Sequence, residues 1–143
     1  MGAYLRRYSM YFEISNPLEY HAALYIRLSK EDESEGPSQS VQNQESLLRE
    51  FVQQHRLNVY DTYIDDGWSG TNFNRPGVQR LLEDAKNGRT NVIIVKDLSR
   101  FGRNYIEVGQ YTDYLFPTYN IRFIAVGDNV DSAVTENTGM DMT

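Results

Sequence analysis

The sequence predicts an α/β fold: an open three-layer domain in which helices flank a mainly parallel central sheet of about four to five strands. Short apolar runs alternate with longer segments of helical period, as expected of βαβ units. The 143 residues suit one compact domain with its own core. Hydrophobic residues at 40% and charged residues at 24% are typical of globular domains. No apolar run reaches the roughly 20 residues that a membrane span needs, so no membrane association is expected.

Four apolar runs are the predicted strands. They cover residues 22–28, 59–64, 91–96 and 121–126. In the first run, side chains alternate between faces, so Tyr25, Arg27 and Ser29 point the same way. A strand of a parallel sheet is normally apolar on both faces, which makes Arg27 near its carboxyl end unusual. Ligands of open α/β sheets bind beyond that end, so this end is a candidate site.

Periodicity and capping residues predict three crossover helices. They cover residues 40–55, 77–87 and 105–116. The first has four apolar residues on one face and Ser38 or Gln39 near its N-cap. Pro76 suits the first position of the second helix and Gly88 its termination. Pro117 is expected to close the third helix, because proline interrupts helical hydrogen bonding.

The two flanks differ from this body. Residues 1–19 are rich in tyrosine without a clear period, and they form an N-terminal extension of uncertain role: an added arm, an artificial extension or a strand for a partner. Residues 20–132 form the predicted domain, and residues 133–143 the start of a truncated C-terminal continuation. The N-terminus lacks the apolar core of a signal peptide, so a cytoplasmic location is expected.

Charge and cysteine content narrow the chemistry. The chain has no cysteine, which excludes disulfides, thiolate metal sites and cysteine nucleophiles. A net charge of −6 argues against a broad surface for nucleic acid, because neutralisation of phosphates by Lys and Arg supplies most non-specific affinity. Six basic residues nevertheless lie at or beside the ends of predicted elements: Arg27, Lys30, Arg75, Lys96, Arg100 and Arg103. Binding of an anion must therefore depend on local charge.

Ser29 and Gln44 each permit two interpretations. Ser29 shares a strand face with Arg27, but residues 29–32 also fit a capping-box pattern, and spacing alone favours the helix cap. Gln44 lies on the apolar stripe of its predicted helix. A buried amide without a hydrogen bond costs about 1 to 3 kcal/mol. Gln44 therefore either meets backbone groups or positions something in a site, and the two are equally supported.

Two carboxylates, Asp65 and Asp66, directly follow the second predicted strand, and a glycine-containing loop leads from them to Arg75. Adjacent carboxylates at a strand end can bind a metal. An acid and Arg75 can instead pair or reach a phosphate. A solvated turn is the commonest outcome for such a segment.

The strongest feature is the segment 95–104, which follows an apolar strand. A helix that begins early would place Arg100 and Arg103 one turn apart on one face. Guanidinium groups bind phosphate oxygens well, and an arginine that stabilises a phosphoryl transition state contributes roughly 10³ to 10⁵ in rate. A solvated basic helix start is the alternative, but cations are unfavourable near a helix N-terminus. An anion is therefore expected nearby.

Taken in order, these motifs resemble the catalytic domain of the resolvase/invertase family of serine recombinases. They are Tyr25-Ile26-Arg27-Leu28-Ser29, Gln44, Asp66-Gly67-Trp68-Ser69-Gly70, Arg75-Pro76-Gly77 and Asp97-Leu98-Ser99-Arg100-Phe101-Gly102-Arg103. The resemblance runs from about residue 21 to 132. Residues 97–100 and 127–132 look most like the large serine recombinases of transposons and phages.

The resemblance implies site-specific DNA recombination without a metal or other cofactor. Ser29 would be the nucleophile that forms a 5′-phosphoserine, with Arg27, Arg100 and Arg103 on the scissile phosphate. The implied supporting or phosphate-binding residues are Tyr25, Gln44, Asp66, Arg75 and Lys96. The implied partners are double-stranded DNA at specific recombination sites and, in the full-length protein, further copies that form a homodimer and a synaptic tetramer. The protein would be associated with DNA in the cytoplasm.

The chain departs from the family pattern in two ways. Ser99 stands where small resolvases carry an aspartate, so the role of that acid does not carry over. The long helix and the C-terminal DNA-binding domains of the family are not among the 143 residues, so we expect the isolated chain to be inactive or weakly active. His21 and His55 lie outside the motifs, which leaves no histidine placed to act as a base.

Two other functions rank below this one. A metal-dependent nuclease would use Asp65, Asp66 and Asp97, each near a predicted strand end. In a receiver-like signalling domain, Asp65 or Asp66 would accept a phosphoryl group with the help of Lys96, but the arginine cluster and the Arg27/Ser29 pair would have no role.

Overall fold

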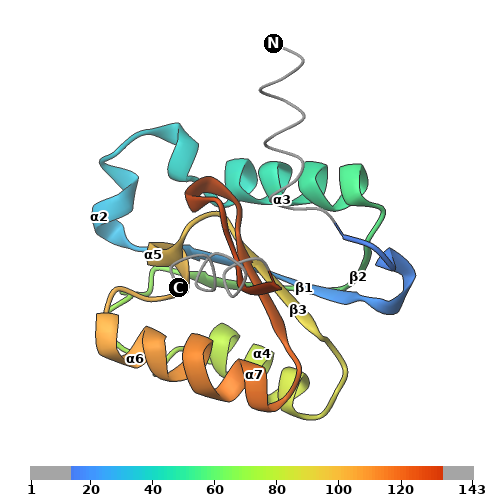
Figure 1. The fold of residues 1–143 in the computed structure, drawn as a ribbon. Coiled ribbons are helices and arrows are strands. Elements are labelled where there is room, and N and C mark those ends of the chain that lie inside the picture. Colours follow the sequence, from blue (N-terminus) through green and yellow to red (C-terminus); the bar gives the residue numbers. More distant parts are fainter. Residues whose placement is uncertain (1–13, 134–143) are drawn as a thin grey trace, which may run out of the picture.

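The computed structural model describes residues 14–133, which form a three-layer α/β domain (Figure 1). Its five-stranded sheet has the order β2-β1-β3-β4-β5. The strands are β1 His21–Leu28, β2 Asn58–Asp66, β3 Val92–Val95, β4 Arg122–Ala125 and β5 Val130–Asp131. The first four are parallel, whereas β5 runs antiparallel to β4. The predicted fold class and all four predicted strands are confirmed.

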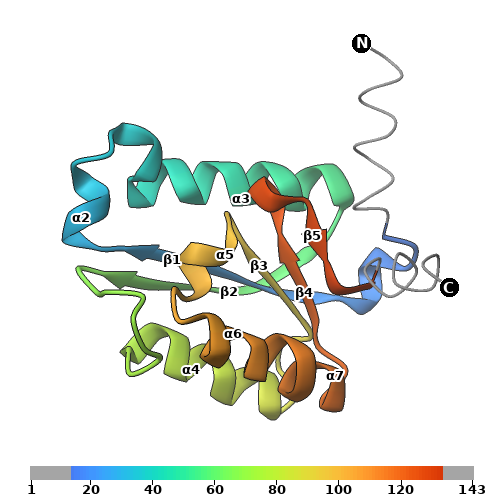
Figure 2. The ribbon, with the colours of Figure 1, turned by 60° about the vertical axis from the view of Figure 1, so that its left-hand side comes forward.

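Helices cover both faces of the sheet (Figure 2). One face carries α3 Val41–His55, and the other carries α4 Pro76–Lys86, α6 Tyr105–Gly109 and α7 Phe116–Thr118. Two four-residue helices, α2 Lys30–Glu33 and α5 Leu98–Phe101, follow the carboxyl ends of β1 and β3. A π-helix, Gln110–Leu115, joins α6 to α7, and 3₁₀ turns span Pro17–Glu19, Pro37–Gln39 and Val126–Asp128.

The core lies on both faces of β1. Leu24 and Ile26 belong to the cluster under α3, while Ala23 and Tyr25 belong to the cluster under α4 and the π-helix. This alternation follows from the two-residue period of a strand. It places the next odd residue, Arg27, on the face of Tyr25 at the carboxyl end of the strand.

Phe101 anchors the short helix α5 to the sheet. Its ring is fully buried and lies 4.8 Å from that of Phe73 and 5.1 Å from that of Phe123, measured between centroids. Burying such a side chain contributes about 1.5 to 3 kcal/mol. A four-residue helix cannot be stable alone. Packing of Phe101 therefore fixes the position of its neighbour Arg100.

The predicted N-cap of α3 is wrong. Ser40 caps this helix, because its Oγ accepts a hydrogen bond from Asn43 N at 3.1 Å. Ser38 and Gln39 lie instead in the 3₁₀ turn Pro37–Gln39, whose closing bond runs from Ser40 N to Pro37 O. The turn leaves Ser40 extended, as an N-cap must be.

Pro117 does not close the third crossover helix. It lies in the first turn of α7, which continues to Thr118. The preceding residues are wound as a π-helix, in which Phe116 N donates to Tyr111 O. In this wider winding the proline ring is not pressed against an α-helical carbonyl one turn before it, which is the clash that normally ends a helix.

The predicted flanks lie mostly outside the described residues: residues 1–13 of the N-terminal extension and 134–143 of the C-terminal continuation. Within the part that the structure does describe, no helix is both long and apolar enough to cross a bilayer.

Candidate active site

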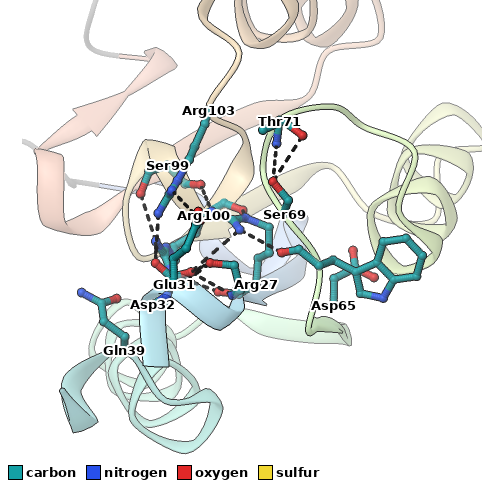
Figure 3. Close-up of polar contacts among 12 residues, drawn as sticks. Arg27, Glu31, Asp32, Gln39, Asp65, Ser69, Thr71, Ser99, Arg100 and Arg103 are labelled. Carbon is teal, nitrogen blue, oxygen red and sulfur yellow. Dashed lines mark hydrogen bonds and ion pairs between the residues drawn. The ribbon is translucent and has the colours of Figure 1, made fainter. Parts of the chain in front are cut away.

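A buried polar cluster lies where β1 and β3 end, the edge of a parallel sheet at which ligands bind (Figure 3). Arg27, Ser29, Asp32, Gln44 and Arg100 are all less than 5% exposed. Buried polar groups need partners. Many of these groups are partners of one another. They come from β1, α2 and α3, which are close in sequence, and from α5, which is about 70 positions away.

Asp32 is the centre of this cluster. Its Oδ1 accepts hydrogen bonds from Arg100 Nη2 at 2.9 Å and from Arg103 Nη2 at 3.0 Å. Its Oδ2 lies 3.8 Å from Arg27 Nη1. The three arginines that the sequence predicts for phosphate binding therefore converge on one internal carboxylate (Figure 3).

Ser29 contacts the same carboxylate. Its Oγ donates to Asp32 Oδ2 at 2.6 Å, and its backbone N donates to the same oxygen at 2.8 Å. Asp32 N donates in return to Ser29 Oγ at 3.3 Å, which completes a capping box for α2. The helix-cap interpretation of Ser29 is confirmed, and the same bonds bring its hydroxyl to the arginine cluster.

The electrostatics of the cluster favour an anion. Burial, together with the neighbouring charge of Arg100, lowers the pKa of Arg27 to about 10, so it stays protonated at neutral pH. Burial by itself raises the pKa of Asp32, but hydrogen bonds from Arg100 and Ser29 outweigh it and hold that pKa below its usual range. Asp32 is thus a carboxylate that faces two buried guanidinium groups. The buried part of the site has a positive charge in excess.

Backbone carbonyls hold Arg27 in place. Its Nε donates to Arg100 O at 3.2 Å, its Nη1 to Trp68 O at 2.9 Å and its Nη2 to Ser99 O at 2.7 Å. A Cβ on Gly70 would lie 2.9 Å from Arg27 Cζ, so the loop after β2 packs its backbone directly on the guanidinium. Carbonyl partners orient the group without neutralising its charge.

The predicted helical pairing of Arg100 and Arg103 is wrong. Helix α5 ends at Phe101, and Gly102 is extended with φ −176°. Arg103 therefore lies outside the helix, where its N donates to Gly70 O at 2.7 Å. The two side chains meet because both reach Asp32, not because they share a helix face.

Gln44 and Lys96 bind backbone beside the cluster. Gln44 Nε2 donates to Arg27 O at 3.0 Å and to Gln39 O at 2.9 Å, so it meets backbone groups. Among the described residues, Gln44 Oε1 and Arg100 Nε are buried without a hydrogen-bond partner. Lys96 Nζ donates to Ser38 O at 3.1 Å, which ties the turn before α3 to the end of β3.

Tyr25 and Arg75 belong to a second buried network. Tyr25 OH donates to Asp65 Oδ2 at 2.7 Å and accepts from Arg75 Nη1 at 2.6 Å. Burial raises the pKa of Tyr25, so it remains a neutral donor. Arg75 Nη2 donates to Phe101 O at 2.6 Å. Arg75 thus holds the end of α5, and through it Arg100, rather than facing the arginine cluster directly.

Asp65, not Asp66, is the buried acid at the carboxyl end of β2. Its Oδ1 accepts from Gly77 N at 2.7 Å and its Oδ2 from Val78 N at 2.9 Å, which caps α4. Asp66 is exposed, and the structure does not bring it into either network. The alternation of β2 decides this, because Asp65 pairs in register with Arg27 and Asp66 points to the opposite face.

Replacing Asp65 by asparagine is expected to lower the free energy of unfolding by about 2 kcal/mol, because an amide donor would face N–H and O–H donors in a buried site. Asp66→Asn is the matched control, and it should change the free energy of unfolding by less than about 0.5 kcal/mol. Urea unfolding of both variants measures this difference. Equal stability of the two variants would contradict the assigned network.

The sequence reasoning missed Asp32 and Gly70 as site residues. Asp32 carried a visible signal, since it is the third residue after Ser29 in the capping-box pattern. Gly70 belongs to the motif of residues 66–70, but its packing on Arg27 had no signal in the sequence, because that contact joins segments 43 positions apart in the numbering. Within residues 14–133, no group of three His, Cys, Asp or Glu side chains could hold a metal ion.

Comparison with known proteins adds the family. A sequence model described as "Resolvase, N terminal domain" matches residues 22–142. The N-terminal catalytic domain of TP901-1 integrase superposes with a TM-score of 0.74 at 26% identity, covering 84% of this chain and 87% of that one. A resolvase family site-specific recombinase from Streptococcus pneumoniae superposes with a TM-score of 0.65 at 27% sequence identity. The match covers 86% of this chain and 90% of that one.

A more distant structure shares the fold alone. The C-terminal catalytic domain of ISC1926 TnpA, an IS607-like serine recombinase, has a TM-score of 0.64 at 21% identity and covers 85% of this chain and 78% of that one. No curated protein sequence matches the chain.

Proposed function

Because this chain belongs to the resolvase family of serine recombinases, we propose that it cuts and rejoins DNA at specific sites, with Ser29 as the nucleophile. The resolvase model covers most of the domain, and the similar solved structures include the N-terminal catalytic domain of TP901-1 integrase and a resolvase family site-specific recombinase. Ser29 would attack a scissile phosphate and form a 5′-phosphoserine link.

One observation carries this proposal: Ser29 Oγ and the guanidinium groups of Arg100 and Arg103 all bind the same carboxylate, that of Asp32. A carboxylate and a phosphodiester both offer anionic oxygens to guanidinium donors. The arrangement of arginines around an anion beside Ser29 therefore supports the binding of a phosphate at this place.

The chemistry needs no external energy. Ser29 Oγ forms a bond to phosphorus while the bond from phosphorus to the 3′ oxygen breaks, so one phosphoester replaces another. A 3′-hydroxyl from an exchanged strand then reverses the step. The arginines would stabilise the negative charge that builds on the phosphoryl oxygens, and Arg100 Nε, which makes an ion pair with Asp97 at 3.6 Å but no hydrogen bond, would be a further donor for them.

We propose double-stranded recombination sites as the partner, with a homodimer and a synaptic tetramer as the working assembly and DNA in the cytoplasm as the location. Tyr25, Gln44 and Arg75 would support the site through the contacts described above. The net charge of −6 indicates that DNA affinity is local to the arginines.

The two other candidate functions gain no support. Asp65 is occupied by the amides of α4 and by Tyr25, and Asp97 Oδ1 accepts from Ser99 Oγ at 2.6 Å and from Arg100 N at 3.1 Å. A metal or an acyl phosphate on these carboxylates would have to displace those donors.

The test is to trap the covalent intermediate. The full protein is incubated in EDTA with DNA that contains the recombination sites at the ends of the element that encodes it. We expect a protein–DNA adduct on a denaturing gel, joined at the 5′ end of the cut and mapped to the peptide that contains Ser29. Cleavage that EDTA abolishes, or that leaves a free 5′-phosphate without an adduct, would contradict the proposal and revive the nuclease.

A further inference from the structure

The proton of Ser29 needs an acceptor, because a serine hydroxyl is a weak nucleophile at neutral pH. The histidines do not supply one. His21 begins β1, at the opposite end of the strand from Ser29, and the ring of His55 stacks on Phe51 with centroids 4.2 Å apart. Ser99 lies in α5 next to Arg100, and its hydroxyl donates to Asp97.

Asp32 is the carboxylate that touches the reacting atom. The bond from Ser29 Oγ to Asp32 Oδ2 is 2.6 Å long, within the range of a hydrogen bond from a hydroxyl to a charged oxygen. The hydrogen bond from Ser29 N to the same oxygen holds the carboxylate next to the hydroxyl. Both bonds are buried, so water does not compete for the proton.

We propose that Asp32 is a catalytic residue that accepts the hydroxyl proton of Ser29 when a scissile phosphate takes Arg100 and Arg103 from it. This inference rests on the proposed recombinase function. Before DNA binds, Asp32 occupies the place of the phosphate among the arginines and holds the nucleophile in a buried position with its hydroxyl directed at the carboxylate.

When Arg100 and Arg103 leave Asp32 for the phosphate, Asp32 becomes a stronger base. The charged groups that face Asp32 are Arg27 from β1, Arg100 from α5, Arg103 after it and, on its own helix, Glu31, which lies 3.5 Å from Arg103. Burial raises the pKa of Asp32, but hydrogen bonds from Arg100 and Ser29 and the charge of Arg100 outweigh it and hold that pKa low, so the resting carboxylate is a poor base. A phosphate that binds the arginines removes their share of this effect and adds a negative charge, and both changes favour protonation of Asp32.

The step balances as follows. The Oγ–H bond of Ser29 breaks and its proton passes to Asp32 Oδ2, while the Oγ electron pair forms the bond to phosphorus. The bond from phosphorus to the 3′ oxygen breaks, and this oxygen leaves with the electron pair and takes a proton from water. Asp32 returns its proton to solvent, or to Ser29 Oγ when the 3′-hydroxyl of an exchanged strand reverses the reaction.

Arg103 is the route by which phosphate enters. Its side chain is 37% exposed, whereas those of Arg100 and Asp32 are nearly inaccessible. Among the arginine contacts of Asp32, the pair with Arg103 is the most exposed and the most easily exchanged. Capture of the phosphate by Arg103 would then expose Arg100, Asp32 and Ser29 in turn.

The experiment measures the rate of adduct formation in single-turnover reactions of the full protein with recombination-site DNA. Asp32→Asn keeps the size of the side chain and removes the base, and we expect a rate about 10² to 10⁴ lower. Glu33→Gln, the neighbouring exposed acid of α2, is the matched control and should react at the parent rate. DNA binding and thermal unfolding are measured for both variants.

A second background separates proton transfer from mere positioning of the arginines. A thiol ionises far more readily than a hydroxyl, so Ser29→Cys needs little help with its proton. In that background Asp32→Asn should slow adduct formation by less than about tenfold. A defect of equal size in both backgrounds would mean that Asp32 acts only through the arginines, and it would overturn the inference.

A DNA site with sulfur in place of the bridging 3′ oxygen tests the direction of proton transfer. Sulfur leaves without a proton, so the Asp32→Asn defect should persist on this substrate, and its disappearance would assign Asp32 to the leaving group instead. Normal adduct formation by Asp32→Asn would end this inference and leave the recombinase intact. Failure of the unsubstituted protein to form any Ser29 adduct would end both.

Discussion

Replacing Arg100 by alanine is expected to lower the rate of DNA cleavage by about 10³ to 10⁵ and the free energy of unfolding by about 3 to 5 kcal/mol. The first effect arises because Arg100 would hold the scissile phosphate in the transition state. The second arises because Asp32, which is fully buried, would lose its 2.9 Å ion pair. Single-turnover cleavage and urea unfolding measure the two effects.

Arg103→Ala is the matched comparison. It removes a guanidinium from the same oxygen of Asp32, at 3.0 Å, but its side chain is 37% exposed. Exposed pairs contribute about 0 to 1 kcal/mol, so this variant should slow cleavage while remaining nearly as stable as the parent. If the two variants lost equal free energy of unfolding, burial of Arg100 would not be the reason that its ion pair with Asp32 stabilises the fold.

Replacing Ser29 by alanine is expected to abolish strand cleavage and recombination, a loss of roughly 10⁴ or more, because removal of an attacking group alone eliminates most of an enzyme's rate. Binding to recombination-site DNA should survive, since the arginines remain. Denaturing gels for the adduct and gel-shift titrations for binding measure these two properties.

Ser29 also caps α2, so Ser29→Ala should lower the free energy of unfolding by about 0.5 to 2 kcal/mol. Ser34→Ala, at the other end of α2, is the control: its Oγ donates only to Glu31 O, at an exposed position. This variant should recombine at the parent rate. Covalent adducts that persist in Ser29→Ala would remove Ser29 as the nucleophile.

The fold could be predicted because its signals are local. The apolar runs that become β1 to β4 and the helical period of α3 and α4 lie within short windows, and hydrophobic burial is the main term that selects these elements. The predicted helix ends were wrong where a neighbouring element changed the local geometry. The π-helix made Pro117 tolerable, and a 3₁₀ turn moved the cap of α3 to Ser40.

The site was predicted in part, for a related reason. Arg27 was predicted as a candidate because a charge near the end of a parallel strand is locally unusual, and Ser29 because it shares that strand face and fits the family resemblance. The choice between Asp65 and Asp66 depended on the register of β2 against β1, and the meeting of Arg100 with Arg103 depended on a carboxylate 68 and 71 positions away. Such long-range pairings leave no periodic trace in a single sequence.

The sequence by itself determined the α/β class and the order of the elements, and it made the arginines and Ser29 the candidates for a site, because hydrophobic periodicity and residue chemistry are properties of short segments. Only the tertiary structure decided that these groups converge on Asp32. Parallel crossovers bring the ends of β1 and β3 together, and in that buried space a carboxylate must find cations while guanidinium groups must find an anion.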